Sequence, residues 1–301
     1  MRNKQFLGHI AAMVSIFVWG FSYVPIVTLL QEFSPFEILF FRFALAVIVL
    51  YLIYPKRMKK ISRREEFLFA AAGLSGVTLY FLLQDFALLN AAASNVGVIV
   101  TIAPVFTVLL SWRFLDEGRP AKIFFLGAAL ALFGIGLISF GASRATFDPL
   151  GDLLAVLAAF SWAVYCIFTK KISAYGHHVI QVTRRIFTYG LLFLVPVMLV
   201  TDFRFGFARF TALPNLMSIL LLGGFASAMC FLFWNFALRE LGAVKTTVYI
   251  YLAPLVTVLA SVFVLRETVT WIHGVGIVFT LGGVVLSNLR AKARTEEVEE
   301  V

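Results

Sequence analysis

Charged side chains are scarce in this chain, since Asp, Glu, Lys and Arg together make up 14% of its 301 residues. Hydrophobic residues reach 61%, whereas a soluble domain is about half apolar and about a quarter charged. Cysteine is also rare: Cys166 and Cys230 lie inside apolar runs and have neither a disulfide framework nor metal-ligand spacing. The four histidines include no HxxxH pair. The apolar composition excludes one large soluble core and indicates a chain solvated by lipid. From the Cys and His patterns we expect no metal site, and we expect no cofactor.

The net charge of +9 does not indicate a nucleic-acid partner, because the basic residues lie in short connections between apolar runs. The N-terminal sequence MRNKQF leads directly into a long apolar segment without a small-residue cleavage site. We therefore expect this first segment to stay as a membrane span instead of being cleaved as a signal peptide.

Apolar segments that match the length needed to cross a bilayer, about 20 residues, follow one another along the chain. Lysine and arginine are distributed unevenly between alternate connections, with eighteen on the side of the N-terminus and four on the other. Because cytoplasmic connections carry the excess of Lys and Arg, both termini are predicted to face the cytoplasm. The ten predicted spans are 8–30, 36–54, 67–89, 93–115, 122–141, 151–170, 179–200, 214–238, 243–265 and 272–289.

An internal duplication organises the sequence. Residues 81–117 align without a gap on residues 231–267, an offset of 150, with 15 of 37 positions identical. The first spans of the two halves align at an offset of 143, which pairs Trp19 with Trp162. Each half therefore holds five spans, and this odd number makes the second copy enter the membrane from the opposite side. The predicted fold is all-α, with ten transmembrane helices in two inverted five-helix repeats.

The repeat boundaries are predicted at 1–144 and 145–292, followed by a cytoplasmic acidic tail at 293–301. Two inverted halves related by an axis in the membrane plane can open alternately to either side, around a site near the midplane. The sequence has no charged ring or carbonyl filter of the kind that channels use. Its apolar runs carry no nucleophile–base or metal-ligand constellation of an enzyme. The duplication therefore favours a transporter.

Three sequence features connect the chain with a known family: the Trp19-Gly20 pair, the FAL…P…TVL…E run of both copies, and the glycine-rich span after each run. In these features both halves resemble the EamA domains of the drug/metabolite transporter superfamily, over nearly the whole chain. The resemblance implies export of amino acids or related metabolites through a cavity lined by the first, third, fourth, sixth, eighth and ninth spans. Such proteins often carry Lys eight residues after the first Trp. This chain has Val27 there, although the second half keeps Lys170.

Polar and aromatic side chains form stripes at helical spacing in several of these spans. Polar groups are unfavourable in lipid, so the stripes face either a cavity or neighbouring helices, and both alternatives remain open. Aromatic faces with neutral hydrogen-bonding groups suit small amphipathic zwitterions better than phosphorylated sugars. The candidate substrate-binding residues are Trp19, Ser22, Tyr80, Gln84, Thr101, Trp162, Tyr165, Trp234, Asn235, Thr247 and Tyr251.

Pro104 and Pro254 occupy equivalent mid-span positions in the two copies. Each removes a helical hydrogen bond and crowds the carbonyl group four residues earlier. We expect kinks in the fourth and ninth spans, which either expose carbonyl groups at the cavity or serve packing alone.

Glycines recur in the fifth and tenth spans, where Gly127 and Gly134 correspond to Gly276 and Gly283. Small residues allow helices to approach closely in a membrane. We expect this contact to form within one chain.

Arg42 and Asp85 lie at similar depth in the second and third spans. An unpaired charge at the bilayer centre costs about 2.5–3.5 kcal/mol on insertion scales, and less at this depth. A structural ion pair, a pair linked to protons or gating, and an Arg42 side chain that reaches the surface are the three alternatives.

Further ionisable residues lie near the span ends. Arg184 and Arg185 are expected to meet Glu240 at the cytoplasmic end of the seventh span. Glu117 and Glu267 end the fourth and ninth spans, where they either anchor helix ends or close gates.

The sequence thus predicts an alternating-access secondary transporter, multi-pass in the cytoplasmic membrane of a bacterium, and not an enzyme. Its expected substrate is a small metabolite, foremost an aromatic or other hydrophobic amino acid. A multidrug or cationic-compound exporter of the same fold, and a membrane-embedded enzyme or lipid-binding scaffold, remain alternatives. The lipid bilayer is an expected partner, a proton is a candidate coupling ion, and the chain is expected to be a monomer or weak homodimer.

Overall fold

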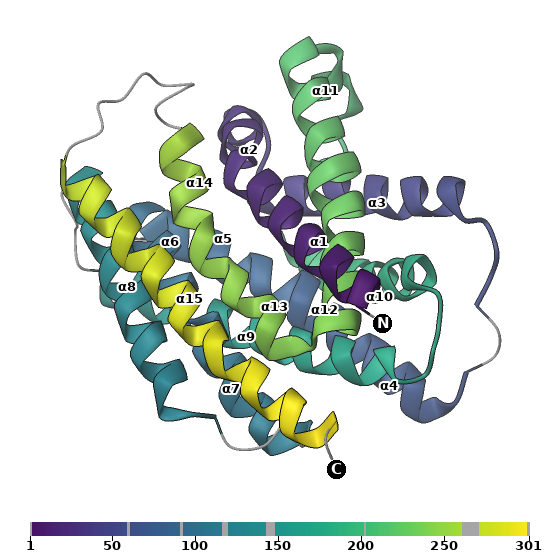
Figure 1. Cartoon of the computed structure of the whole chain (residues 1–301). Helices are drawn as coiled ribbons and strands as arrows, with labels where there is room; N and C mark the ends of the chain where they lie inside the picture. The colour runs from purple at the N-terminus through teal and green to yellow at the C-terminus, as the bar shows by residue number, and fades with distance from the viewer. Residues whose placement is uncertain are drawn as a thin grey trace.

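Helices account for all the regular structure that the computed structural model describes. The described residues are 2–58, 61–90, 93–115, 120–142, 148–201, 203–260 and 271–299. Five of the predicted spans are single helices (Figure 1), namely α3 (Pro35–Ile53), α8 (Lys122–Ala142), α9 (Pro149–Ser173), α10 (Val179–Val200) and α15 (Trp271–Glu299).

The other five spans are interrupted. The first consists of α1 (Arg2–Phe21) and α2 (Tyr23–Leu30), and the fourth of α6 (Ala93–Val100) and α7 (Ala103–Phe114). The third joins α4 (Arg63–Gly73) and α5 (Tyr80–Asn90) through the π-helix η1 (Leu74–Leu79). The eighth joins α11 (Leu213–Leu220) and α12 (Cys230–Leu241) through the π-helix η3 (Leu221–Met229). The ninth contains α13 (Ala243–Thr247), the 3-10 helix η4 (Val248–Leu252) and α14 (Ala253–Ala260).

Two helices extend beyond the predicted spans for local chemical reasons. Helix α4 begins at Arg63 instead of residue 67, because Ser62 and Glu65 form a capping box that satisfies the first backbone N–H groups. Helix α15 continues to Glu299, through a segment rich in Ala, Lys, Arg and Glu that favours helix even outside lipid.

The two prolines begin new helices. Pro104 follows a turn at Thr101 and Ile102, and Pro254 follows η4. Each proline occupies the second residue of its helix, where the missing backbone N–H group is not needed. The fourth and ninth spans are therefore divided at equivalent positions.

Equivalent elements of the two halves lie against each other. Helices α8 and α15 run side by side along one flank of the bundle (Figure 1). Gly127 lies against Gly283 and Ser287, while Gly134 lies against Gly276. Rising residue numbers on one helix thus meet falling numbers on the other, so these corresponding helices are antiparallel. In addition, η1 overlaps η3 when it is shifted by 150 residues.

Connections predicted on opposite sides of the membrane lie at opposite ends of the bundle. At one end, which we name the basic end, Gln181 donates to the carbonyl groups of Lys56 and Arg57, and Lys170 donates to that of Arg239. At the other end, Glu37 forms an ion pair with Arg209. The predicted cytoplasmic connections therefore share one end.

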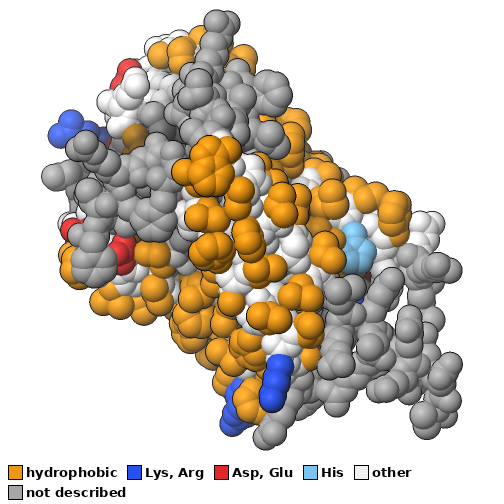
Figure 2. All heavy atoms as spheres, turned by 60° about the vertical axis from the view of Figure 1, so that its left-hand side comes forward, with side chains coloured by type: hydrophobic (Ala, Val, Ile, Leu, Met, Phe, Trp, Pro, Cys, Tyr) orange, Lys and Arg blue, Asp and Glu red, His pale blue; other side chains and the backbone are white. Residues whose placement is uncertain are grey.

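The outer surface of the bundle is largely apolar. Figure 2 shows hydrophobic side chains over most of the visible face, with Lys and Arg gathered near its edges. Exposed side chains on α8 and α15 include Leu126, Phe133 and Val278. Within the described residues, six helices have the length and composition to cross a membrane, and four further apolar helices are shorter. Lipid is the solvent that suits this surface.

The contact between α8 and α15 leaves no room for a methyl group at Gly134. A Cβ atom there would lie 2.5 Å from the carbonyl oxygen of Gly276 and from the backbone nitrogen of Thr280. We expect Gly134→Ala to lower the free energy of unfolding by about 1–3 kcal/mol, because the helices must separate. Gly136→Ala is the matched control, since its Cβ meets no atom within 4 Å. Reversible unfolding in mixed micelles measures both variants, and equal stabilities would contradict the close packing.

Candidate functional site

Aromatic rings from four helices meet at the centre of the bundle. Trp162 of α9 lies 5.6 Å from Trp19 of α1, 5.8 Å from Trp234 of α12 and 4.8 Å from Tyr80 of α5, measured between ring centres. Phe231 of α12 lies 5.3 Å from Trp19 and 5.7 Å from Trp162. We name these five residues the aromatic cluster.

The aromatic cluster lies where equivalent residues of the two halves meet. Trp19 and Trp162 correspond at the offset of 143 and are in edge-to-face contact. Phe81 and Phe231 correspond at the offset of 150, and their ring centres are 6.4 Å apart. In an inverted repeat only positions near the two-fold axis can contact their own equivalents. The cluster therefore lies where the two halves face each other.

Some polar atoms at the cluster lack a hydrogen-bond partner. The Nε1 group of Trp19 donates to the carbonyl oxygen of Ala226 at 2.8 Å. By contrast, Trp162 Nε1, Trp234 Nε1 and Gln84 Oε1 are buried and have no such partner in the described part of the chain. Gln84 lies one helical turn after Tyr80, whose ring contacts Trp162. A buried unpaired group costs about 1–3 kcal/mol, so a ligand that satisfies it gains that energy.

Burial increases from α5 towards the basic end. Trp19, Tyr80 and Gln84 are partly exposed, whereas Trp162 is 5% exposed and Trp234 is fully buried. Past the tryptophans, Tyr165 donates to Asn235 Oδ1 at 2.5 Å, and Asn235 Nδ2 donates to Thr183 Oγ1 at 2.9 Å. These bonds tie α9, α12 and α10 together. They separate the cluster from a small pocket at the basic end that reaches Asn235.

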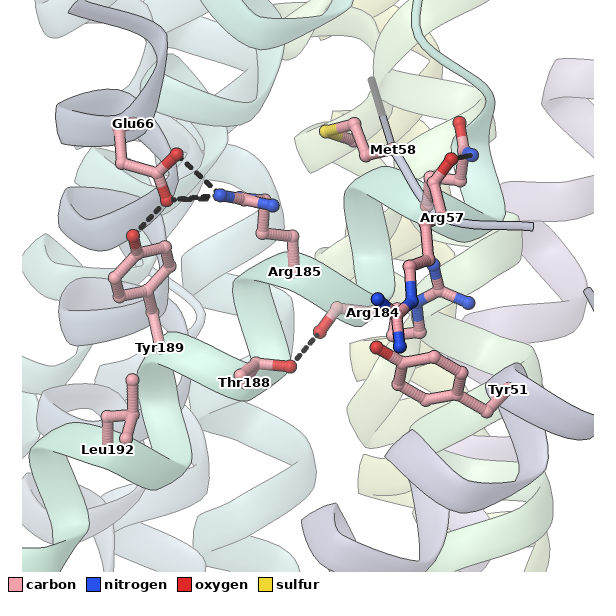
Figure 3. Close-up of a pocket in the computed structure, with 10 residues that line it drawn as sticks. Tyr51, Arg57, Met58, Glu66, Arg184, Arg185, Thr188, Tyr189 and Leu192 are labelled. Atoms are coloured by element: carbon pink, nitrogen blue, oxygen red, sulfur yellow. Dashed lines mark hydrogen bonds and ion pairs between the residues drawn. The ribbon is translucent and has the colours of Figure 1, made fainter. Parts of the chain in front are cut away.

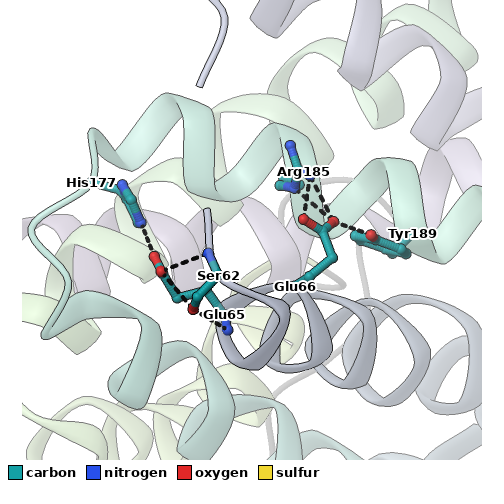
Figure 4. Close-up of polar contacts among 6 residues, drawn as sticks. All are labelled: Ser62, Glu65, Glu66, His177, Arg185 and Tyr189. Atoms are coloured by element: carbon teal, nitrogen blue, oxygen red, sulfur yellow. Dashed lines mark hydrogen bonds and ion pairs between the residues drawn. The ribbon is translucent and has the colours of Figure 1, made fainter. Parts of the chain in front are cut away.

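A second layer of polar contacts closes the basic end (Figure 4). Glu66 of α4 forms an ion pair with Arg185 of α10 and accepts a hydrogen bond from the hydroxyl group of Tyr189. Glu65 accepts a hydrogen bond from Nε2 of His177 at 2.7 Å. Both contacts join α4 to the α10 side of the bundle. At this end the Tyr165–Asn235–Thr183 bonds and these ion pairs thus join α4, α9, α10 and α12.

The structure brings together six of the eleven candidate substrate-binding residues in one connected group: Trp19, Tyr80, Trp162, Tyr165, Trp234 and Asn235. Ser22 donates to the carbonyl oxygen of Trp19, and Gln84 lies on the α5 face of the cluster. Tyr251 packs elsewhere, in a second core formed with residues of α7, α8 and α15. Thr247 donates to carbonyl groups within its own turn, and Thr101 is buried at the break before α7.

Arg42 and Asp85 interact at a distance. Their charges influence each other, but the described residues include no ion pair within 4.0 Å between them. Arg42 Nε donates instead to Ser227 Oγ at 2.9 Å, and its guanidinium group lies 4.6 Å from the ring centre of Phe81. Arg42 is buried, which rules out a side chain that reaches the surface.

The expected contact of Arg184 and Arg185 with Glu240 requires correction. Arg185 binds Glu66, because α4 and α10 run side by side and present these residues to each other. Arg184 donates to backbone carbonyl groups. Glu240 forms an ion pair with its neighbour Arg239, with 3.4 Å between Arg239 Nε and Glu240 Oε1. Glu117 and Glu267 lie outside the described residues.

Several site residues escaped the sequence analysis. Phe231 contacts both Trp19 and Trp162, and it begins the second copy of the repeat opposite Phe81, which was an available signal. Thr183 and Glu66 are single polar residues near span ends. Their partners, Asn235 and Arg185, become evident only when the neighbouring helices are known.

Comparison with known proteins identifies the family. A model described as the EamA-like transporter family matches residues 6–140 and 149–289. An uncharacterized transporter of Archaeoglobus fulgidus is 29% identical over 294 residues, which cover 94% of this chain and 97% of that protein. A probable terminal-alkyne amino-acid exporter of Streptantibioticus cattleyicolor is 27% identical over 243 residues, which cover 81% of this chain and 80% of that protein. A crystal structure of 18% sequence identity shares the fold with a TM-score of 0.75, over 97% of this chain and 99% of that one.

The chain belongs to the EamA-like transporter family, with one match in each half. It is therefore an all-helical, multi-pass secondary transporter of the cell membrane and not an enzyme. The predicted membrane fold and transport activity are confirmed by this membership. The substrate, the coupling ion and the orientation of the basic end stay predictions.

The Tyr165–Asn235 hydrogen bond can be tested by removing one oxygen atom. Tyr165→Phe leaves Asn235 Oδ1 without its donor at a buried site, so the free energy of unfolding should fall by about 1–3 kcal/mol. Tyr175→Phe is the control, because Tyr175 is exposed on the same side of the bundle. Reversible unfolding in mixed micelles gives both values, and a Tyr165→Phe variant as stable as the control would argue against the bond.

Proposed function

We propose that this transporter exports amino acids or similar small amphipathic metabolites, with aromatic or other hydrophobic amino acids preferred, and that the aromatic cluster binds them. The observation that carries the proposal is the pair of unpartnered polar atoms, Trp162 Nε1 and Gln84 Oε1, beside a wall of aromatic faces. An indole N–H group can donate to a carboxylate, and an amide oxygen can accept from an ammonium group. The rings then cover the apolar side chain of the substrate.

Export by this route requires the basic end and the opposite end to open in turn. The Tyr165–Asn235–Thr183 bonds and the Glu66–Arg185 ion pair are the contacts that must break for entry from the basic end. The position of the cluster between equivalent residues supports this mechanism, because the same residues then serve both conformations.

The relative from Streptantibioticus cattleyicolor supports the substrate class. Its name describes a probable exporter of an amino acid, and the similarity covers 81% of this chain. At 27% identity this relationship favours the class of substrate without specifying the side chain.

A cationic compound is the second candidate substrate. Asp85 follows Gln84 in α5 and interacts electrostatically with Arg42, whose guanidinium group lies over Phe81 beside the cluster. The nearby charge of Arg42 offsets that of Asp85, which favours a zwitterion with no net charge.

Counterflow in proteoliposomes distinguishes these substrates. Purified protein is reconstituted with one unlabelled compound inside, and uptake of the labelled compound is measured with and without a pH gradient. The panel contains phenylalanine, leucine, glutamate, lysine and a lipophilic cationic dye. Exchange of phenylalanine or leucine supports the proposal, whereas exchange of the dye alone supports the second candidate. A rate that depends on the pH gradient identifies a proton as the coupling ion.

Trp162→Phe tests the role of the indole N–H group. A smaller aromatic ring remains and the N–H donor is lost, so the apparent affinity for the amino-acid substrate should fall about tenfold. Trp271→Phe is the control, since Trp271 is 77% exposed at the start of α15. Counterflow at varied substrate concentration gives both values. An unchanged apparent affinity in Trp162→Phe would exclude this group from substrate binding.

A further inference from the structure

A cavity of about 310 Å³ lies at the basic end, outside the aromatic cluster. It is bounded by the end of α3, the segment that follows it, the first turn of α4 and the first half of α10 (Figure 3). Its lining residues are Tyr51, Arg57, Met58, Glu66, Gln181, Arg184, Arg185, Thr188, Tyr189 and Leu192.

The cavity carries excess positive charge. Arg185 is neutralised by Glu66, and this pair forms one wall together with Tyr189 (Figure 3). Arg57 and Arg184 lie together on the other wall, above the ring of Tyr51. Among the described residues, no carboxylate lies within 4.0 Å of either guanidinium group. Two like charges in one cavity favour an anion that bridges them.

Arg184 is held in place before any ligand binds. Its two terminal nitrogens donate to the carbonyl oxygens of Tyr54 at 2.8 Å and Lys56 at 2.9 Å. Its guanidinium group lies 3.8 Å from the ring centre of Tyr51. Gln181 donates to the carbonyl groups of Lys56 and Arg57, which fixes the segment that carries Arg57. The Arg184 guanidinium group, being held already, loses little entropy on binding a ligand.

One side of the cavity opens onto apolar surface. Leu192 is 57% exposed and Tyr51 is 45% exposed, although both line the cavity. Along α3 and α10 the surface continues with exposed Ile48, Val195 and Leu199. In a membrane protein this surface lies against lipid tails. The cavity therefore lies where charged residues meet hydrocarbon.

We infer that this cavity binds the headgroup of an anionic phospholipid. Guanidinium groups bind phosphate oxygens through paired hydrogen bonds, and Arg57 and Arg184 supply two such groups. The acyl chains would then follow the exposed surface of α3 and α10, which a soluble phosphate ion does not use. The basic end is the predicted cytoplasmic end, where anionic lipids give the membrane its negative surface. This site is independent of the proposed substrate.

Native mass spectrometry of the detergent-purified full chain tests the site, with phosphatidylglycerol and phosphatidylcholine as probes. We expect one saturable phosphatidylglycerol site, and Arg57→Gln should weaken it about tenfold by removing one charged partner. Thr188→Trp should also weaken it, because the larger side chain fills the cavity while every charge remains. Arg63→Gln is the matched control, since Arg63 is exposed nearby but does not line the cavity.

The outcomes are decisive in each direction. Selective loss in Arg57→Gln and Thr188→Trp, with binding by Arg63→Gln unchanged, supports the site. Equal binding of the two lipids, or equal loss in all three variants, overturns it in favour of general attraction to the basic end. Competition by glycerol phosphate at the same concentration as the lipid would overturn the lipid assignment and indicate a soluble anion. Failure of amino-acid counterflow leaves this result unaffected.

Discussion

The contact between equivalent elements of the two halves is the constraint on which the rest of this structure depends. At one flank it is a backbone contact, because Gly127 and Gly134 bring α8 and α15 together without intervening side chains. At the centre it is a ring contact, between Trp19 and Trp162. Both contacts hold the inverted halves in one arrangement. The aromatic cluster, which is the candidate substrate site, lies at the second of these contacts.

Much of this could be predicted from the sequence, because apolar length and internal repetition are local properties of the chain. The ten spans and the central tryptophans follow from them. The extent of α4 depends on the capping box of Ser62 and Glu65, a weaker signal than its apolar run. The partner of Arg185 was not predictable, since it depends on which helices become neighbours. Tyr251 lies one turn after Thr247 in the ninth span, as expected of a candidate residue, yet it packs in a different core from the aromatic cluster.

The two halves are similar in fold but not in charge. Arg42 and Arg185 are equivalent in sequence, yet Arg42 is buried against Ser227 and Phe81, whereas Arg185 binds Glu66 near the basic end. A strictly symmetric duplication would have two conformations of equal energy. The Glu66–Arg185 ion pair has no equivalent at Arg42, and such differences between the copies give the two conformations different energies.

The π-helices η1 and η3 affect how the third and eighth spans present their side chains. A π-helical turn holds more residues than an α-helical turn, and each added residue shifts the following side chains by about 100° around the helix axis. The stretch before η1 packs against both α9 and α10, whereas the stretch after it packs against α9 and brings Tyr80 to Trp162. In the third span, the segments before and after η1 therefore point their side chains in different directions. The same span can pack against its neighbours with one segment and line the centre of the bundle with the other.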